Sequence, residues 1–161
     1  MFNQDIVKCS EVLIAQQLTI AFAESASAGR MVAEFSMVPD AGKFLKGGFA
    51  CYDAGLKEKL LMVPEALIEQ FTPESAEVTH AMAKGLQEII PAAIHVAVTG
   101  LTTSGGSETS EKPVGTMFVC ALVGEYELFA EKVIFDGEPE EIILQTVYYT
   151  AALLVSKLAT V

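Results

Sequence analysis

Apolar residues recur along this chain with two spacings, one typical of helices and one typical of buried strands. In residues 4–16, Ile6, Cys9 and Leu13 are three or four positions apart, which predicts an amphipathic helix. Continuous apolar runs between polar or glycine-containing segments predict strands instead. Predicted strands of this kind cover residues 18–23, 47–52 and 94–99, and two further predicted strands cover residues 116–123 and 126–135. The last two are joined by Gly124-Glu125, which predicts an antiparallel hairpin.

Helix boundaries between and after these strands are indicated by prolines and capping residues. A helix that begins near Arg30 is expected to end before Pro39, because the residue before a proline disfavours helix. Thr72 as a cap and Pro73 as the first helical residue predict a helix that extends to about residue 90. The remaining predicted helices cover residues 57–62, 65–70 and 138–158. Strands and helices therefore alternate, which predicts an α/β fold, a three-layer α/β/α sandwich on a mixed, mostly parallel sheet.

Composition favours one domain that spans residues 1–161. Hydrophobic residues make up 52% of the chain, enough for a sizeable core. No apolar run is long enough to span a bilayer, and the first residues lack the pattern of a signal peptide. A cytoplasmic protein without membrane contact is therefore expected. The net charge of −11 repels nucleic acid, which excludes that class of partner.

Cysteines and histidines give no sign of a disulfide or metal site. Cys9, Cys51 and Cys120 are odd in number and far apart, and the last two stand in apolar runs where small core residues are expected. His80 and His95 lack the spacing of paired metal ligands and are expected to be structural or at the surface. This pattern predicts no metal site.

The segment Ala23-Glu24-Ser25-Ala26-Ser27-Ala28-Gly29 links a predicted strand to a predicted helix through small residues. Such a turn places a hydroxyl at a helix N-terminus, where free backbone N–H groups favour negative charge. Ser25 is therefore a candidate nucleophile or part of an anion site. Tyr52 and Thr99 also lie at the ends of predicted strands, and ligands of open α/β sheets bind beyond the carboxyl ends of strands. The three residues are expected at one edge of the sheet.

A serine nucleophile needs a base, and the chain has no suitably placed histidine. Lys57 is the candidate base if desolvation or nearby positive charge lowers its pKa, and Tyr52 is a candidate for relaying a proton or orienting the pair. Backbone N–H groups of residues 27–29 are candidates for stabilising an oxyanion. The alternative is a capping Ser25, a surface Lys57 and a Tyr52 in the core.

Two further features near Ser25 each allow two interpretations. Several basic residues close to this turn form either a solvated surface or a local positive pocket. They are Arg30, Lys43, Lys46, Lys57 and Lys59. The segment from Gly100 to Pro113, rich in Gly, Ser and Thr, is either a flexible connection or a backbone cradle for a small ligand. It lacks the Gly-Lys-Ser/Thr sequence of a nucleotide-binding P-loop.

Four sets of residues together resemble the C-terminal domain of the competence-damage-inducible CinA proteins, the nicotinamide-nucleotide amidase family. They are Ala23-Glu24-Ser25 with Gly29, the pair Tyr52 and Lys57, Thr99-Gly100, and the segment 111–116. The resemblance covers about residues 5–158. Many members of that family carry a further nucleotide-binding-like domain in front. This chain resembles the stand-alone form, a single CinA C-terminal-like domain.

The resemblance implies hydrolysis of nicotinamide mononucleotide to nicotinic acid mononucleotide and ammonia. It assigns Ser25 as the nucleophile, with Lys57 and Tyr52 as its catalytic partners. The predicted substrate-binding residues are Ser27, Gly29, Thr99 and Gly100. No metal and no cofactor are implied, and the family is commonly oligomeric, so a homo-oligomer is expected.

Three departures from the family pattern bear on the substrate. Ala26, Ser27 and Ala28 stand where the family turn usually has Cys-Thr-Gly, and residues 101–104 replace the usual Ile-Ala-Gly-Pro. Pro139 replaces an arginine that would suit a substrate phosphate, because a guanidinium binds phosphate in a bidentate manner. The alternatives to a nicotinamide-mononucleotide amidase are a non-catalytic protein that binds a small ligand and an amidase for a non-phosphorylated amide.

Overall fold

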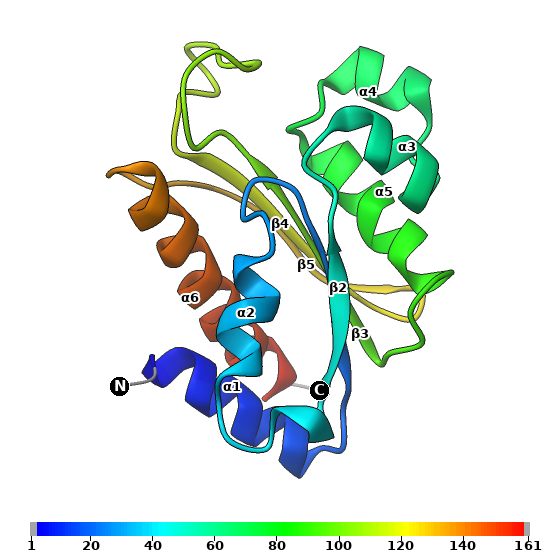
Figure 1. Ribbon diagram of the computed structural model, residues 1–161, viewed down its shortest axis with the longest axis vertical. Coiled ribbons are helices and arrows are strands. Elements are labelled where there is room, and N and C mark those ends of the chain that lie inside the picture. Colours follow the sequence, from blue (N-terminus) through cyan, green and yellow to red (C-terminus); the bar gives the residue numbers. More distant parts are fainter. Residues whose placement is uncertain (1–2, 160–161) are drawn as a thin grey trace.

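Five strands form one mixed sheet in the computed structural model, which describes residues 3–159 (Figure 1). In chain order they are β1 (Ile20–Glu24), β2 (Leu45–Ala50), β3 (Ile94–Gly100), β4 (Thr116–Val123) and β5 (Tyr126–Ile134). Across the sheet the order is β2-β1-β3-β4-β5. β1 pairs in parallel with β2 and β3, whereas β4 is antiparallel to both β3 and β5. The prediction of an α/β fold with a mixed sheet and a hairpin is confirmed.

Helices cover both faces of this sheet (Figure 1). On one face lie α1 (Gln4–Ala15), α2 (Arg30–Ser36) and α6 (Pro139–Leu158). On the other lie α3 (Ala54–Leu61), α4 (Glu65–Phe71) and α5 (Ala76–Gln87). A short 3₁₀ helix, Ala41–Lys43, precedes β2. The predicted three-layer sandwich is thus confirmed. Within residues 3–159, no helix combines the length and the apolar character needed to cross a membrane.

The two faces of the sheet carry side chains of different size, as β1 shows. Ile20 and Phe22 pack into the core beneath α1, α2 and α6. Ala21 and Ala23 alternate with them and pack into the core beneath α5. The alternation follows from the two-residue period of a strand. Because the side chains toward α5 are small, this helix can pack close to the sheet.

Helix α3 is held against α5 by a close backbone contact. A Cβ added to Gly85 of α5 would lie 1.9 Å from the carbonyl oxygen of Leu61 in α3. Any side chain at position 85 would therefore push the two helices apart. Since α3 also carries Lys57, this contact helps to fix the position of the candidate base.

The helix cap expected at Thr72 lies three residues later, at Ser75. Helix α5 begins at Ala76, and the hydroxyl of Ser75 accepts a hydrogen bond from the N–H of Val78 at 3.3 Å. Thr72 instead ends α4 with a φ of 70°. The predicted cap was wrong because Thr72 has a positive φ, whereas Ser75 has the extended backbone that an N-cap requires.

The carboxyl ends of β1, β2 and β3 meet at one edge of the sheet, as predicted. Glu24, the last residue of β1, pairs with Ala50 of β2 and with Val98 of β3. The connections that leave these strands therefore start side by side. They are the turn 25–29, the segment 51–53 before α3, and the loop 101–115 before β4. This edge carries the candidate functional site.

Candidate functional site

A cavity of about 240 Å³ opens at this edge of the sheet. The lining residues are Ser25, Ala26, Tyr52, Glu74 and residues 100–106. The structure thus brings three of the predicted site residues, Ser25, Tyr52 and Gly100, together from three separate strand ends. A small organic molecule is the kind of ligand that binds in such a hollow at the ends of parallel strands.

The turn after β1 is held by backbone hydrogen bonds. The N–H of Ser25 donates to the carbonyl of Val98 at 2.9 Å, and the carbonyl of Ser25 accepts from the N–H of Ala28 at 3.0 Å. Ala28 and Gly29 both have positive φ values, 50° and 95°. Glycine adopts such values freely, whereas an alanine there is strained. The conformation at Ala28 therefore depends on the contacts that surround the turn.

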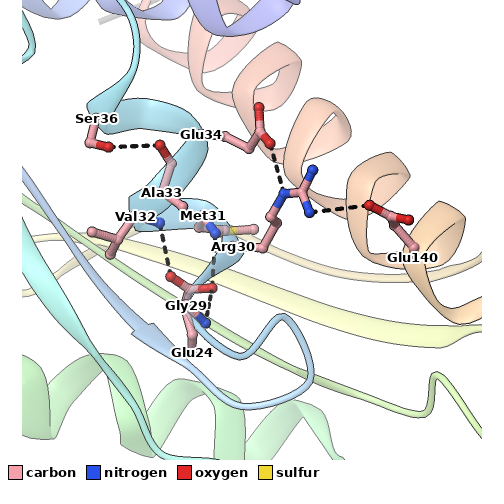
Figure 2. Close-up of polar contacts among 9 residues, drawn as sticks. All are labelled: Glu24, Gly29, Arg30, Met31, Val32, Ala33, Glu34, Ser36 and Glu140. Atoms are coloured by element: carbon pink, nitrogen blue, oxygen red, sulfur yellow. Dashed lines mark hydrogen bonds and ion pairs between the residues drawn. The ribbon is translucent and has the colours of Figure 1, made fainter.

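Glu24 supplies the negative charge that the N-terminus of α2 attracts (Figure 2). Its side chain is fully buried. The carboxylate accepts hydrogen bonds from the N–H groups of Gly29, Met31 and Val32 at 3.0, 2.9 and 2.9 Å, and from the Ser27 hydroxyl at 2.6 Å. This helix N-terminus, predicted to favour an anion, is therefore occupied by the protein's own carboxylate. Sequence analysis missed the role of Glu24, although an acidic residue shortly before a helix is a signal for it.

Two backbone N–H groups of the turn remain open. Those of Ala26 and Ser27 donate to no group in residues 3–159, and the hydroxyl of Ser25 makes no hydrogen bond there. Ser25 and Ala26 both line the cavity. Free N–H donors beside a free hydroxyl can stabilise the oxyanion of an acyl-transfer reaction. Of the three predicted N–H groups, those of residues 27–29, only that of Ser27 is open, because Ala28 donates to the carbonyl of Ser25 and Gly29 to the carboxylate of Glu24.

Lys57 lies inside the protein. Only 1% of the residue is exposed, and its Nζ donates to the backbone carbonyl groups of Cys51 at 3.1 Å and Tyr52 at 3.3 Å. Burial lowers the pKa of the Lys57 amine below its usual value, although the charge of Glu74 opposes this shift. Tyr52 itself is 66% exposed beside the cavity. These positions exclude the alternative of a surface Lys57 and a Tyr52 in the core.

Lys57 and Ser25 are connected through Cys51. The N–H of Cys51 donates to the carbonyl of Glu24 at 2.6 Å, next to Ser25, and the Cys51 carbonyl accepts from Lys57. Nζ of Lys57 and Oγ of Ser25 form no hydrogen bond with each other. This does not exclude a catalytic pair, because hydrogen bonds between catalytic groups are often long in the absence of substrate. A neutral amine has two N–H groups, and the two carbonyl groups accept both. Its lone pair is then available to take a proton.

Three of the four predicted substrate-binding residues are not among the residues that line the cavity. Thr99 is fully buried, and its hydroxyl shares a hydrogen bond of 2.8 Å with the hydroxyl of Thr79. Ser27 and Gly29 both donate to the carboxylate of Glu24. Direct contact of these three residues with a substrate stays a prediction. The fourth residue, Gly100 at the end of β3, lines the cavity.

The loop after β3 is held against the α4–α5 connection by Lys112. Its Nζ donates to Oγ1 of Thr72 at 2.6 Å, to the carbonyl of Glu74 at 2.9 Å and to Oγ of Ser107 at 2.8 Å. The hydroxyl of Ser107 donates in turn to the carboxylate of Glu74. The loop is therefore a wall of the cavity with fixed contacts, which favours the cradle over the flexible connection. Glu74, which lines the cavity, is a site residue that sequence analysis missed.

Removal of the Lys112 amine is expected to loosen this wall. Lys112→Ala loses three hydrogen bonds, so we expect the free energy of unfolding to fall by about 1–2 kcal/mol and proteolysis within residues 101–113 to become faster. Lys46→Ala is the control, because Lys46 is exposed on β2 and lies outside the cavity. Equal cleavage rates of this loop in both variants would contradict the clamp.

The basic residues near Ser25 do not form a positive pocket. Arg30, the one arginine of the chain, forms ion pairs with Glu34 at 2.7 Å and Glu140 at 3.3 Å (Figure 2). These carboxylates, Glu34 first, raise the pKa of Arg30. The exposed basic residues nearby are Lys43, Lys46 and Lys59. Among the residues that line the cavity, the charged one is Glu74, an acid.

Comparisons of the sequence identify relatives over almost the whole chain. The family model of the CinA C-terminal domain matches residues 4–158. A putative competence-damage inducible protein of Desulforamulus reducens is 35% identical over 161 residues, 98% of this chain and 38% of the relative. A CinA-like protein of Petrotoga mobilis is 36% identical over 140 residues, 86% of this chain and 34% of the relative. The chain thus spans about a third of the length of these curated relatives.

Solved structures share the fold. A CinA superfamily protein from Klebsiella pneumoniae superposes with a TM-score of 0.90 at 23% identity, and the match covers 98% of both chains. Another from Escherichia coli has a TM-score of 0.86 at 27% identity, covering 93% of this chain and 86% of that one. The family match and the curated relatives identify the family of this chain, and the solved structures have the same fold. The chain belongs to the CinA C-terminal domain family.

Proposed function

We propose that this chain is a small-molecule amidohydrolase with Ser25 as the nucleophile and Lys57 as the base, and that nicotinamide mononucleotide is its substrate. The observation that carries the proposal is the buried amine of Lys57, held by two carbonyl groups near the strand end from which Ser25 extends. Burial favours the neutral amine, the form that a base requires. The family motifs support the choice of substrate.

In this mechanism, Lys57 takes the proton of Ser25 while Oγ attacks the carbonyl carbon of the amide. The oxyanion of the tetrahedral intermediate is stabilised by the N–H groups of Ala26 and Ser27. When the C–N bond breaks, the leaving amine takes the proton from Lys57 and departs as ammonia. Water then attacks the acyl-enzyme, with Lys57 again as the base, which releases the acid and restores Ser25. Tyr52, at the cavity wall, orients the pair or relays a proton.

Loss of the Lys57 amine is expected to remove the base. We expect Lys57→Met to lower kcat/KM for ammonia release by at least about 100-fold, because general-base catalysis contributes roughly that much. Lys59→Met is the matched control, since Lys59 lies on the same helix and is exposed. Undiminished turnover in a folded Lys57→Met variant would exclude this lysine as the base.

The pH profile provides a separate test of Lys57. The neutral amine is the active form, so kcat/KM is expected to rise with pH and to level off above the pKa of Lys57. Because burial lowers this pKa, the plateau begins at a lower pH than an exposed lysine would allow. The rise is expected to disappear in Lys57→Met. A variant that keeps the profile of the unchanged protein would assign the rise to another group.

A second candidate function is amide hydrolysis on a substrate without phosphate. The observation that favours it is that the charged residue in the lining of the cavity, Glu74, is acidic. Outside the lining, Arg30 is already paired with two carboxylates, and Pro139 begins α6. A screen of ammonia release from nicotinamide mononucleotide and from amides that lack phosphate distinguishes the two functions. Turnover of the nucleotide alone supports the first, and turnover of neutral amides alone supports the second.

The screen also tests a non-catalytic role. Binding of a small molecule without turnover, indifferent to Ser25→Ala, would identify a ligand-binding protein that keeps only the fold. The family resemblance further leads us to propose a homo-oligomer in the cytoplasm. Sedimentation equilibrium of the purified chain measures the oligomeric state, and a monomer at all concentrations would contradict that part of the proposal.

A further inference from the structure

Outside the cavity, three potential metal ligands meet on the α5 side of the sheet. They are His80 of α5, Cys120 of β4 and Glu127 of β5. Nδ1 of His80 lies 3.0 Å from a carboxylate oxygen of Glu127 and 3.9 Å from Sγ of Cys120. All three ligand atoms lie within 4.8 Å of one another. The group combines nitrogen, sulfur and oxygen donors at one point of the surface.

These separations are close to those around a tetrahedral Zn²⁺ ion. Zinc binds sulfur at about 2.3 Å and nitrogen or oxygen at about 2.0–2.2 Å, which holds neighbouring ligand atoms roughly 3.4–3.6 Å apart. The two distances from Nδ1 of His80, 3.0 Å to the carboxylate of Glu127 and 3.9 Å to Sγ of Cys120, bracket this range. The third separation, between Sγ of Cys120 and the carboxylate of Glu127, is within 4.8 Å, so rotation of the exposed His80 and Glu127 side chains has to close it around one ion.

An ion can reach this group from solvent. The side chains of His80 and Glu127 are 40% and 46% exposed, whereas Cys120 is buried beneath them. A shallow hollow that includes Glu77 and Ala130 adjoins the two exposed ligands. The thiol thus forms the floor of the group and the two exposed side chains form its rim. This arrangement leaves the solvent side open for a further ligand.

We propose that His80, Cys120 and Glu127 bind Zn²⁺ through three protein ligands, with water in the fourth position. The donor set favours this ion, because Zn²⁺ accepts thiolate, imidazole and carboxylate together, whereas Mg²⁺ and Ca²⁺ require oxygen ligands. His80 binds through Nδ1, so its proton resides on Nε2. Cys120 binds as the thiolate, and its proton leaves to solvent when the ion enters.

The buried thiol sets a limit on the affinity. Burial, with a contribution from Glu127, raises the pKa of the Cys120 thiol to about 12. The ion must therefore displace a firmly held proton, and binding is weaker than at a site whose cysteines are already ionised. Without an ion, the contact between His80 and Glu127 is a partly exposed pair of the kind that adds little stability.

Zinc binding by the full chain tests the proposal directly. The purified protein is stripped of metal and titrated with Zn²⁺ in competition with a chromophoric chelator, and one Zn²⁺ per chain is expected. His80→Gln, Glu127→Gln and Cys120→Ala should each weaken binding by at least about tenfold. With Co²⁺ as the probe, a thiolate-to-metal charge-transfer band is expected that disappears in Cys120→Ala.

Two control variants distinguish this site from general effects. Glu125→Gln changes an exposed acid on the same hairpin, and Cys9→Ala changes a buried cysteine in the other core. Both should bind Zn²⁺ as the unchanged protein does. If Cys120→Ala fails to fold, the two surface variants still decide the question. The proposal is overturned if the chain takes no Zn²⁺ from the chelator, or if His80→Gln and Glu127→Gln bind it undiminished.

Discussion

Alanine in place of Ser25 is expected to lower the rate of ammonia release from nicotinamide mononucleotide by at least about 10³-fold, because loss of a nucleophile removes the covalent route. The Ser25 hydroxyl lines the cavity and makes no hydrogen bond within residues 3–159, so its removal leaves no buried group unpaired. The free energy of unfolding should therefore change by less than about 1 kcal/mol. Loss of turnover without loss of stability is the expected combination.

Two further serine variants make the Ser25 result specific. Ser36→Ala removes a hydroxyl on the outer part of α2, where it donates to the carbonyl of Ala33, and turnover should be unaffected. Ser25→Cys keeps a nucleophile at the same place and should form an acyl-enzyme that mass spectrometry can detect. If Ser25→Ala keeps full activity, the nucleophile is another group, even if Lys57→Met is inactive.

The fold could be predicted because its information is local. Apolar runs indicated β1, β3 and β4, and the turn at Gly124-Glu125 indicated the hairpin that adds β5. The parallel pairing of β1 with β2 and β3 brought Ser25 and Tyr52 to one edge. Boundaries were less certain where several capping residues occur together. Between α4 and α5, both Thr72 and Ser75 carry a hydroxyl, and only the backbone conformation decides which of them caps the helix.

The contacts around the site could not be predicted, because they join segments that are far apart in sequence. Lys112 meets Thr72 across 40 positions, and Ser107 meets Glu74 across 33. The burial of Lys57 depends on how α3 packs, which no periodicity near the lysine reports. The three proposed zinc ligands could not be predicted together for the same reason, because they come from three different elements. The register of the hairpin that carries two of them also shifts between Ala121 and Leu122, which no sequence pattern indicated.

The largest loss of stability is expected at Glu24, the residue before the nucleophile. Its buried carboxylate accepts hydrogen bonds from three backbone N–H groups (Figure 2) and from the hydroxyl of Ser27. Glu24→Ala therefore leaves four donors without their partner. We expect the free energy of unfolding to fall by about 3–4 kcal/mol. Urea denaturation of the variant and of the unchanged protein measures this difference.

A second substitution at position 24 separates the effect of the negative charge from the effect of the side chain's shape. Glu24→Gln keeps one acceptor oxygen but places an NH₂ group opposite N–H donors. We therefore expect the free energy of unfolding to fall by about 1–2 kcal/mol. Glu140→Gln is the matched control, because Glu140 is 73% exposed and its ion pair with Arg30 contributes little. Stability of Glu24→Gln equal to that of Glu140→Gln would contradict the carboxylate as the support of the turn.

The same variant links stability to catalysis. The four hydrogen bonds of Glu24 fix the turn 25–29, and through it the position of Ser25 and of the open N–H groups of Ala26 and Ser27. Glu24 touches none of the reacting atoms in the proposed mechanism, so Glu24→Gln should lower kcat more than it raises KM. It should also leave unchanged the pH profile that Lys57 sets. A shifted profile would mean that Glu24 acts on the base itself rather than on the position of the nucleophile.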